Sequence, residues 1–393
     1  MLFTFHLTLA AAFAVVSARP PKMADYGSAI PLTRIMKVDS MKRIVAKGKA
    51  RLDTFNTISG MRMFLSGQIT NDHISYVAPV LIAGHVRQLL VDTESSLIWC
   101  GAEVEFRPSS NAMNMRRRVP IKATTGSEIF SGRLLGEKVN LGNLTVPLQS
   151  VCQIRNLVGG YSGVDGTLGL GPAALTEKTN EMMETVSTLT MNLISDGSIS
   201  AEVYGVYLKP DLGNGASEAA GELTVGHINT NRYTGELTYF NTPDFNPASR
   251  YWSLEIAEMT FGTTSLASSF TANIDTGTTL IHFPATAYSI FLTSAGGETD
   301  TDSGLAAFKT KPTANIDIKI GSTTYTLTPQ QYLVPEALYE KLHLATGKYY
   351  AWIADSGKHE INSISATIGQ KFLENYYSVY DTTNSRIGFA ASA

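Results

Sequence analysis

The sequence has few of the residues that special scaffolds require. Only two of its 393 residues are cysteine, which excludes a small disulfide-rich fold. Charged residues make up 17% of the chain and hydrophobic residues 44%, a composition that excludes an intrinsically disordered protein. The seven histidines are scattered, and no His/Cys cluster has the spacing of zinc ligands, so we expect no metal.

Long apolar runs are also missing. No segment approaches the roughly 18 uninterrupted apolar residues of a membrane-spanning helix, so we expect no membrane anchor. A shorter apolar run at residues 7–16 is followed by Ala18 and then by Arg19-Pro20. This pattern is typical of a secretory signal peptide cleaved after Ala18, and its position disfavours the alternative of a buried strand. We therefore expect a secreted or vacuolar protein with a signal peptide over residues 1–18.

The two cysteines, Cys100 and Cys152, lie in the same half of the chain. An even cysteine count in an oxidising compartment favours a disulfide. The alternative is a pair of buried free thiols, because sequence spacing does not fix the geometry of a bridge.

One glycosylation sequon is present, at Asn143-Leu144-Thr145. It follows Gly142, which indicates a turn. In a secreted protein such a turn is a plausible glycan acceptor, so Asn143 is a predicted glycosylation site.

Charge is distributed unevenly. Residues 19–64 hold ten basic and three acidic residues, a net charge of +7, whereas residues 65–393 hold 21 basic and 31 acidic residues, a net charge of −10. A basic leader before an acidic body predicts an intramolecular electrostatic partner that lies in an acidic cleft and is weakened at low pH. A nucleic-acid-binding arm is the alternative, which the secretory signal disfavours, so we expect no nucleic-acid partner.

The pattern after the leader is that of an all-β protein in two halves. A length of 393 residues predicts about two domains. From about residue 74, short apolar strands alternate with Gly, Asn and Ser turns, and helices are expected only near 185–193, 285–295 and 336–344. The motif Asp-Thr-x-(Ser/Thr)-(Ser/Thr)-Leu-Ile occurs at 92–98 and again at 275–281. Each copy is followed by a hydrophobic-Gly turn, at 165–172 and at 365–372, which predicts a duplicated lobe.

A pseudo-twofold arrangement of two lobes would bring Asp92 and Asp275 together. Two adjacent carboxyl groups can share one proton, so that one acts as a general base on water and the other as an acid toward a carbonyl oxygen. Their neighbours suit this role: Ser95 and Thr278 can donate to the carboxylates, Thr93 and Thr276 can join the loops, and Gly277 lets backbone N–H groups approach.

These motifs resemble the pepsin-like aspartic proteases, and most closely the secreted fungal members of the polyporopepsin type. The resemblance covers about residues 74–390 and rests on four stretches: NIDTGTTLI (273–281), GVDGTLGLGP (163–172), AGELTVG (220–226) with RYTGELTY (232–239), and FLENYYSVYDTTNSRIGFA (372–390). It implies a bilobal all-β endopeptidase that is made as a zymogen and cleaves polypeptides at acidic pH. The implied parts are a propeptide at 19–70, an N-terminal lobe at 71–215 and a C-terminal lobe at 216–393. Asp92 and Asp275 are the implied catalytic pair, no cofactor is implied, and two lobes in one chain suggest a monomer.

The N-terminal half departs from the family pattern. Glu94 replaces the glycine that Gly277 provides in the second loop, which adds a third carboxyl beside the pair and costs energy where the backbone requires a positive φ. The flap, whose equivalent is Ala123-Thr124-Thr125-Gly126-Ser127, lacks the family's tyrosine. Two hypotheses follow: an acid endopeptidase with reduced activity, or a catalytically inactive homologue that binds peptides or acts as an inhibitor.

Overall fold

The computed structural model describes residues 27–56, 72–122, 129–158, 163–179, 184–213, 219–360 and 363–393. The expected signal peptide, the end of the leader, the flap and the lobe boundary at 215 lie outside these described residues. Five α-helices are described: α1 (Met41–Phe55), α2 (Leu189–Ser195), α3 (Ala285–Ala295), α4 (Pro329–Tyr332) and α5 (Gln370–Leu373). No described helix has both the length and the hydropathy needed to cross a membrane.

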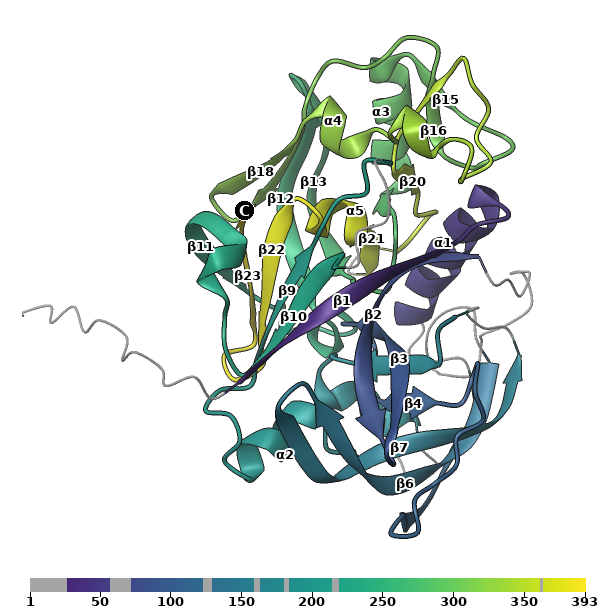
Figure 1. The fold of residues 1–393 in the computed structure, drawn as a ribbon. Helices are drawn as coiled ribbons and strands as arrows, with labels where there is room; N and C mark the ends of the chain where they lie inside the picture. The colour runs from purple at the N-terminus through teal and green to yellow at the C-terminus, as the bar shows by residue number, and fades with distance from the viewer. Residues whose placement is uncertain are drawn as a thin grey trace, which may run out of the picture.

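The N-terminal lobe is a mixed β-sheet with the strand order β2-β3-β8-β4-β7-β6-β5. The sheet folds on itself, so that β2 also pairs with β6. Its strands are β2 (His73–Ile82), β3 (His85–Asp92), β4 (Ile98–Cys100), β5 (Met113–Lys122), β6 (Ile129–Leu141), β7 (Leu144–Val158) and β8 (Gly166–Gly169). Because β-branched and large apolar side chains alternate along these strands, one face of the sheet forms the lobe's core. Figure 1 shows this lobe below the rest of the molecule.

The C-terminal lobe is built around a second sheet, in the order β18-β17-β12-β13-β21-β14-β20. Its strands are β12 (Ser253–Phe261), β13 (Thr264–Ile274), β14 (Ile281–Phe283), β17 (Ile316–Ile320), β18 (Thr323–Leu327), β20 (Ile353–Asp355) and β21 (Ile364–Ile368). A small sheet of β15 (Gly297–Thr299), β16 (Ala306–Phe308) and β19 (Tyr349–Tyr350) lies beside α3 at the top of Figure 1.

A central sheet joins the two lobes, and the leader completes it. Its strands run β11 (Tyr233–Asn241), β23 (Arg386–Ser392), β22 (Tyr376–Asp381), β9 (Val203–Leu208), β10 (Gly221–Val225) and β1 (Ser28–Lys37). The leader strand β1 pairs with β10 through Ser28–Leu32 and with β2 through residues 33–37. One strand of the leader therefore connects the central sheet to the sheet of the N-terminal lobe, as the diagonal purple strand of Figure 1 shows.

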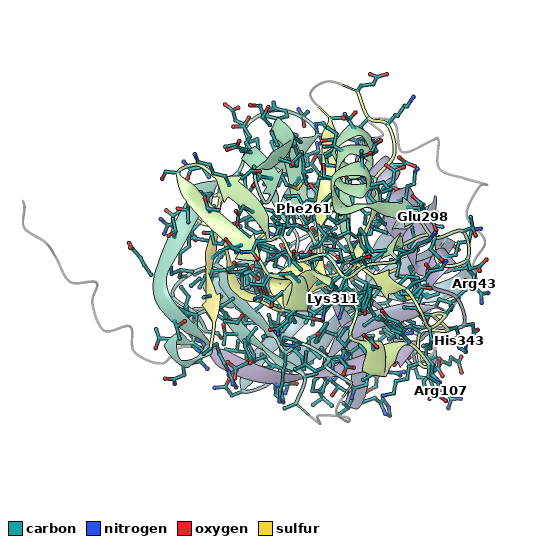
Figure 2. All side chains as sticks on the ribbon, turned by 90° about the horizontal axis from the view of Figure 1, so that it is seen from above. Arg43, Arg107, Phe261, Glu298, Lys311 and His343 are labelled. Carbon is teal, nitrogen blue, oxygen red and sulfur yellow. The ribbon has the colours of Figure 1, made fainter. Side chains whose placement is uncertain are left out.

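The leader continues as helix α1, which lies between the two lobes at the right of Figure 1. Met41, Ile44, Gly48, Leu52 and Phe55 recur three to four positions apart, and all are buried. This spacing gives the helix one apolar face. Side chains fill the space between the elements in Figure 2, and Arg43 of α1 lies there at the same edge as Glu298.

The duplicated all-β architecture agrees with the fold predicted from the sequence. The helix expected at 285–295 is α3, which ends at Gly296 in a left-handed conformation (φ +66°). The helix expected at 185–193 starts later, at Leu189, because the Thr188 side chain accepts the Met191 N–H and caps it there. The prediction at 336–344 was wrong: only the 3₁₀ turn Glu336–Leu338 forms. Helix α1 was not predicted.

Candidate active site

The two Asp-Thr loops meet between the lobes. Asp92 ends β3 and Asp275 directly follows β13, and both side chains are fully buried. The two loops repeat the same local hydrogen bond: the Glu94 N–H donates to Asp92 Oδ1 (2.9 Å), and the Gly277 N–H donates to Asp275 Oδ1 (2.8 Å). The structure thus brings together two carboxyl groups that are 183 positions apart in the sequence.

Thr93 and Thr276 join the loops across the pseudo-twofold axis. The Thr93 N–H donates to Thr276 Oγ1 (3.1 Å), and the Thr276 N–H donates to Thr93 Oγ1 (3.1 Å). Each hydroxyl in turn donates to a carbonyl of the opposite loop, Thr93 to Ile274 (2.9 Å) and Thr276 to Val91 (2.8 Å). Four buried hydrogen bonds therefore hold the carboxyl groups in register.

The hydroxyl groups beside the two aspartates differ. Thr278 Oγ1 donates to Asp275 Oδ2 at 2.6 Å, as the sequence suggested. The equivalent bond from Ser95 is not formed. Asp92 Oδ2 has no hydrogen-bond partner, and Asp92 Oδ1 accepts from Arg51 and from the Glu94 N–H. Burial raises the pKa of Asp92, and the charge of Asp275 raises it further, while Arg51 opposes both effects.

Arg51 of the leader helix binds both aspartates at once. Its Nη2 donates to Asp92 Oδ1 (2.6 Å) and to Asp275 Oδ1 (3.1 Å), and its Nε donates to Asp275 Oδ2 (2.7 Å). The guanidinium is 3% exposed and fills the space between the carboxyl groups. Gly277 is required here, because a Cβ at this position would lie 2.9 Å from Arg51 Nη2 and from Asp92 Oδ1.

Other basic residues of the leader pair with acidic groups of the body. Arg34 contacts Asp211 (3.2 Å), and the Arg34 guanidinium also donates to the Tyr76 hydroxyl (3.3 Å). Lys49 contacts Asp355 (3.6 Å), although both of these side chains are about 40% exposed. The basic leader therefore lies on acidic groups of the body, which is the arrangement that its charge indicated.

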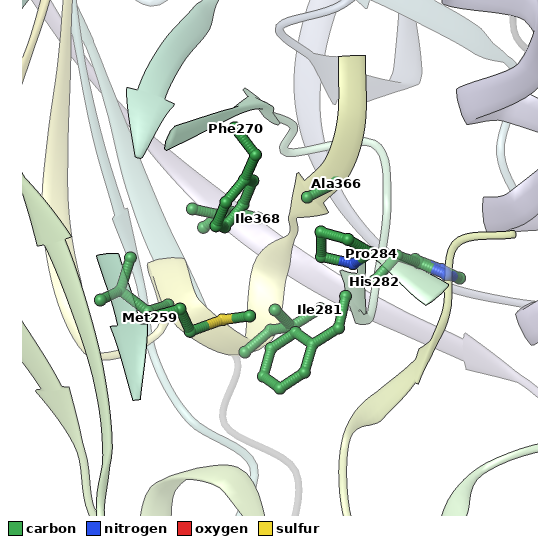
Figure 3. A pocket seen from close by; sticks show the side chains of 9 residues that line it. Met259, Phe270, Ile281, His282, Pro284, Ala366 and Ile368 are labelled. Carbon is green, nitrogen blue, oxygen red and sulfur yellow. The ribbon is translucent and has the colours of Figure 1, made fainter. Parts of the chain in front are cut away.

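Helix α1 also contacts a buried histidine. His282 of β14 is fully buried, and neither ring nitrogen makes a hydrogen bond. A Cβ added to Gly48 of α1 would lie 2.2 Å from His282 Nε2, so the helix backbone packs directly on the imidazole. Figure 3 shows the ring directed away from Met259 and Ile368, which line an apolar cavity of about 10 Å³ beside it. Burial lowers the pKa of His282 to about 4.

Glu94 is accommodated without backbone strain. The described residues with positive φ do not include it, so the cost that a positive φ would bring to a glutamate does not arise. Its side chain is 2% exposed, and Oε2 accepts a hydrogen bond from Asn273 Nδ2 at 3.3 Å. Burial raises the pKa of Glu94 well above its ordinary value, and the charge of Asp275 adds to this effect.

The expected disulfide is corrected by the structure, in which Cys100 and Cys152 are free buried thiols. Strands β4 and β7 are parallel neighbours, with Cys100 opposite Gln153 and Trp99 opposite Cys152. Adjacent strand positions point to opposite faces of a sheet, so the two sulfur atoms lie on different sides. Accordingly, Cys100 packs in the main core, whereas Cys152 packs with Trp99 in a separate cluster.

Two other predicted sites are the flap and the glycosylation sequon. The flap residues Ala123, Thr124, Thr125, Gly126 and Ser127 fall outside the described residues, between β5 and β6. Asn143 is exposed in the turn between β6 and β7, beside Gly142 (φ +59°). Glycosylation at Asn143 stays a prediction. Within the described ranges, no group of three or more His, Cys, Asp or Glu residues is arranged to hold a metal ion.

Sequence reasoning missed Arg51, His282 and Asn273. A signal for Arg51 was available: it is a charged residue on the otherwise apolar face of residues 41–55, three positions after Gly48. His282 and Asn273 carry no such signal, because only their long-range packing gives them a role.

Three comparisons place the chain among known proteins. The family model for eukaryotic aspartyl proteases matches residues 76–392. Polyporopepsin from Irpex lacteus is 34% identical over 331 residues, covering 82% of this chain and 96% of that protein, and rhizopuspepsin from Rhizopus chinensis is 28% identical, covering 78% and 76%. The crystal structure of the aspartic proteinase from Irpex lacteus superposes with a TM-score of 0.78 at 29% identity, over 93% of this chain and 98% of that one. The chain therefore belongs to the eukaryotic aspartyl protease family, as an aspartic-type endopeptidase that acts on polypeptides.

Proposed function

We propose that this protein is a secreted acid endopeptidase that is made as a zymogen, with Asp92 and Asp275 as its catalytic pair. The observation that supports this most is the double Asp-Thr loop, in which two buried carboxyl groups are locked by the Thr93–Thr276 hydrogen bonds. The reaction needs one ionised and one protonated carboxyl, and two close carboxyl groups in a buried site favour that state.

The hydrogen bonds assign the two roles. Without Arg51, Asp275 still accepts bonds from the Gly277 N–H and the Thr278 hydroxyl, whereas Asp92 accepts one, from the Glu94 N–H. Donated hydrogen bonds stabilise a carboxylate. Asp275 is therefore the base that takes a proton from water, and Asp92 is the acid that protonates the carbonyl oxygen as the water oxygen attacks the carbonyl carbon. The C–N bond of the tetrahedral diol then breaks as Asp275 gives its proton to the leaving nitrogen and Asp92 takes a proton from a diol hydroxyl, which restores both carboxyl groups.

The leader, residues 19–70, acts in this proposal as an intramolecular inhibitor. Arg51 fills the space between the carboxyl groups that the attacking water must enter, and β1 occupies a strand position between β10 of the central sheet and β2 of the N-terminal lobe. Acidification protonates the acidic partners of the leader, which weakens its hold. A secretory signal at 1–18 and action as a monomer, outside the cell or in a vacuole, complete the proposal.

A catalytically inactive homologue that binds peptides or inhibits a protease is the second candidate. The observations that favour it are Glu94, whose carboxyl is buried beside the catalytic pair, and the absence of a tyrosine in residues 77–160, which include the flap. Glu94 causes no backbone strain, and it leaves the bond from its N–H to Asp92 intact. The geometry therefore supports the first candidate better.

The experiment is an assay of the acidified protein. The purified zymogen is held at about pH 3–4, where free carboxyl groups are largely protonated, and an unfolded protein is offered as substrate with and without a statine-type inhibitor. Inhibitor-sensitive cleavage that Asp275→Asn abolishes supports the proposal. Tight binding of the inhibitor without any cleavage would instead establish the inactive homologue.

A further inference from the structure

The carboxyl group of Glu94 is buried but only half satisfied. Oε2 accepts from Asn273 Nδ2 (3.3 Å), while Oε1 has no hydrogen bond of normal geometry, although the Trp252 backbone faces the carboxyl and favours its ionised form. Asn273 is itself oriented, because its Oδ1 accepts from Ser253 Oγ (2.5 Å), which directs the amide NH₂ group toward Glu94. A buried acceptor without a donor is costly, so this oxygen is a place where a ligand donor gains affinity.

The surroundings of Glu94 carry negative charge. Asp275 and Asp92 both act on the Glu94 carboxyl and disfavour its ionisation, and Arg51 is the cation that opposes them. Three carboxyl groups thus surround one guanidinium. When the leader leaves, that guanidinium leaves with it, and the carboxyl groups stay on the body of the protein.

Helix α1 of the leader contacts two groups near Glu94, the catalytic pair and Tyr251. On one side Arg51 lies on the two aspartates. On the other side Phe55, one helical turn further along α1, packs on Tyr251 with ring centroids 4.7 Å apart, and the Tyr251 hydroxyl lies within the electrostatic influence of Glu94. Displacement of α1 therefore removes its contacts both with the catalytic pair and with Tyr251.

We propose that Glu94, oriented by Asn273, is a specificity-determining residue that selects a lysine or arginine side chain next to the scissile bond. This inference rests on the proposed function, because it assigns the substrate preference of the same cleft. A cationic side chain would donate to Oε1 in a charge-assisted hydrogen bond. A neutral aliphatic side chain at the same place would leave the buried carboxyl oxygen without a partner, which is the basis of strong discrimination by polar sites. The zymogen already places an arginine from its own leader among these carboxyl groups.

The preference has a pH signature. Burial and the neighbouring aspartates keep Glu94 protonated in acid. A protonated carboxyl attracts a cation weakly, whereas the ionised form pairs with it fully. The preference for lysine and arginine over leucine therefore increases with pH as Glu94 ionises.

The test uses the acid-processed enzyme and a set of peptides that differ only in the two residues flanking the cleaved bond, which are lysine, arginine, glutamine or leucine. The ratio of kcat/KM for the lysine peptide to that for the leucine peptide is measured at pH 4 and pH 6. We expect a ratio above about 10 at pH 6 that Glu94→Gln reduces at least tenfold. Glu236→Gln on the exposed strand β11 is the matched control, which removes an equal charge and leaves the ratio unchanged.

A wild-type ratio near one at both pH values, or a ratio that survives Glu94→Gln, overturns the proposal. If Glu94→Gln does not fold, the wild-type enzyme decides instead. Its lysine-to-leucine ratio must then rise between pH 4 and pH 6, whereas its glutamine-to-leucine ratio must not. If no peptide is cleaved, the proposed function fails separately. Calorimetric binding of the same peptides to the acid-treated protein then tests the preference, and equal affinity for lysine and leucine peptides overturns it.

Discussion

We expect the pH at which the leader helix separates from the body to depend on His282, and this is our most detailed prediction. The imidazole is packed against Gly48 of α1, and the adjacent apolar cavity of about 10 Å³ has room for at most one water molecule. Three charged groups act on the ring besides its own burial: Asp355 and Asp275 raise its pKa, and Lys49 of α1 lowers it. Burial outweighs them, so the closed form holds the ring neutral.

The sign follows from the two pKa values. The ring titrates at about 4 in the closed form, and at about 6.5 once release exposes it to water. Between these values the released form binds more protons, so acidification through this window favours release. At 1.36 kcal/mol per pKa unit, the contribution is about 3 kcal/mol at pH 4, or roughly 100-fold in the equilibrium for release, and it is close to zero at pH 7. These values are upper limits, because they assume that release exposes the ring fully.

The perturbation is His282→Gln, which keeps a polar side chain of similar size and removes the titration. We expect α1 of the variant to stay protected from hydrogen exchange at pH 4, up to about 100-fold more than in the wild type after correction for intrinsic exchange rates, with no difference at pH 7. Processing of the leader at pH 4 slows in parallel. His85→Gln, at an exposed histidine of β3, serves as the control. The same pH dependence in His282→Gln and the wild type would refute this reasoning.

Three further predictions concern the contacts described above. Arg51→Leu removes every charged bond from the leader to the catalytic pair. The unprocessed variant is therefore expected to bind a statine-type inhibitor at pH 7 at least tenfold more tightly than the wild type does. Equal affinities would show that the leader is held by other contacts. Cys100 and Cys152 are both expected to resist a thiol reagent in the native protein, because burial raises the pKa of Cys152 to about 12 and that of Cys100 further. In denaturant both are expected to react fully without reductant. Labelling that requires a reductant would demonstrate a disulfide. Thr93→Val removes the two hydrogen bonds that the Thr93 hydroxyl makes, to the Ile274 carbonyl and from the Thr276 N–H, and should lower the free energy of unfolding by about 1–3 kcal/mol. Denaturant titration measures this change, and an unchanged midpoint would mean that the loops are held elsewhere.

Much of the candidate site was predictable because its residues are local and repeated. The two Asp-Thr loops each carry their motif within seven residues, and short polar motifs between apolar strands determine a turn without outside help. The cysteines show where such reasoning fails. Their number and compartment favoured a bridge, but the register of β4 on β7 places them on opposite faces of the sheet. Register depends on the pairing of whole strands, which the spacing of two residues does not determine.

Sequence alone determined the duplicated β-lobe pattern, the pair Asp92 and Asp275, the departure at Glu94 and the positive charge of the leader. Tertiary structure alone decided which basic residue of the leader binds the catalytic pair. It also decided that Gly48 packs on His282 and that Asn273 donates a hydrogen bond to Glu94. The physical reason is the range of the interactions. Strand and turn patterns reflect neighbours in the chain, whereas a buried ion pair or a half-satisfied carboxyl exists only after segments about 40 to 230 residues apart have packed and excluded water.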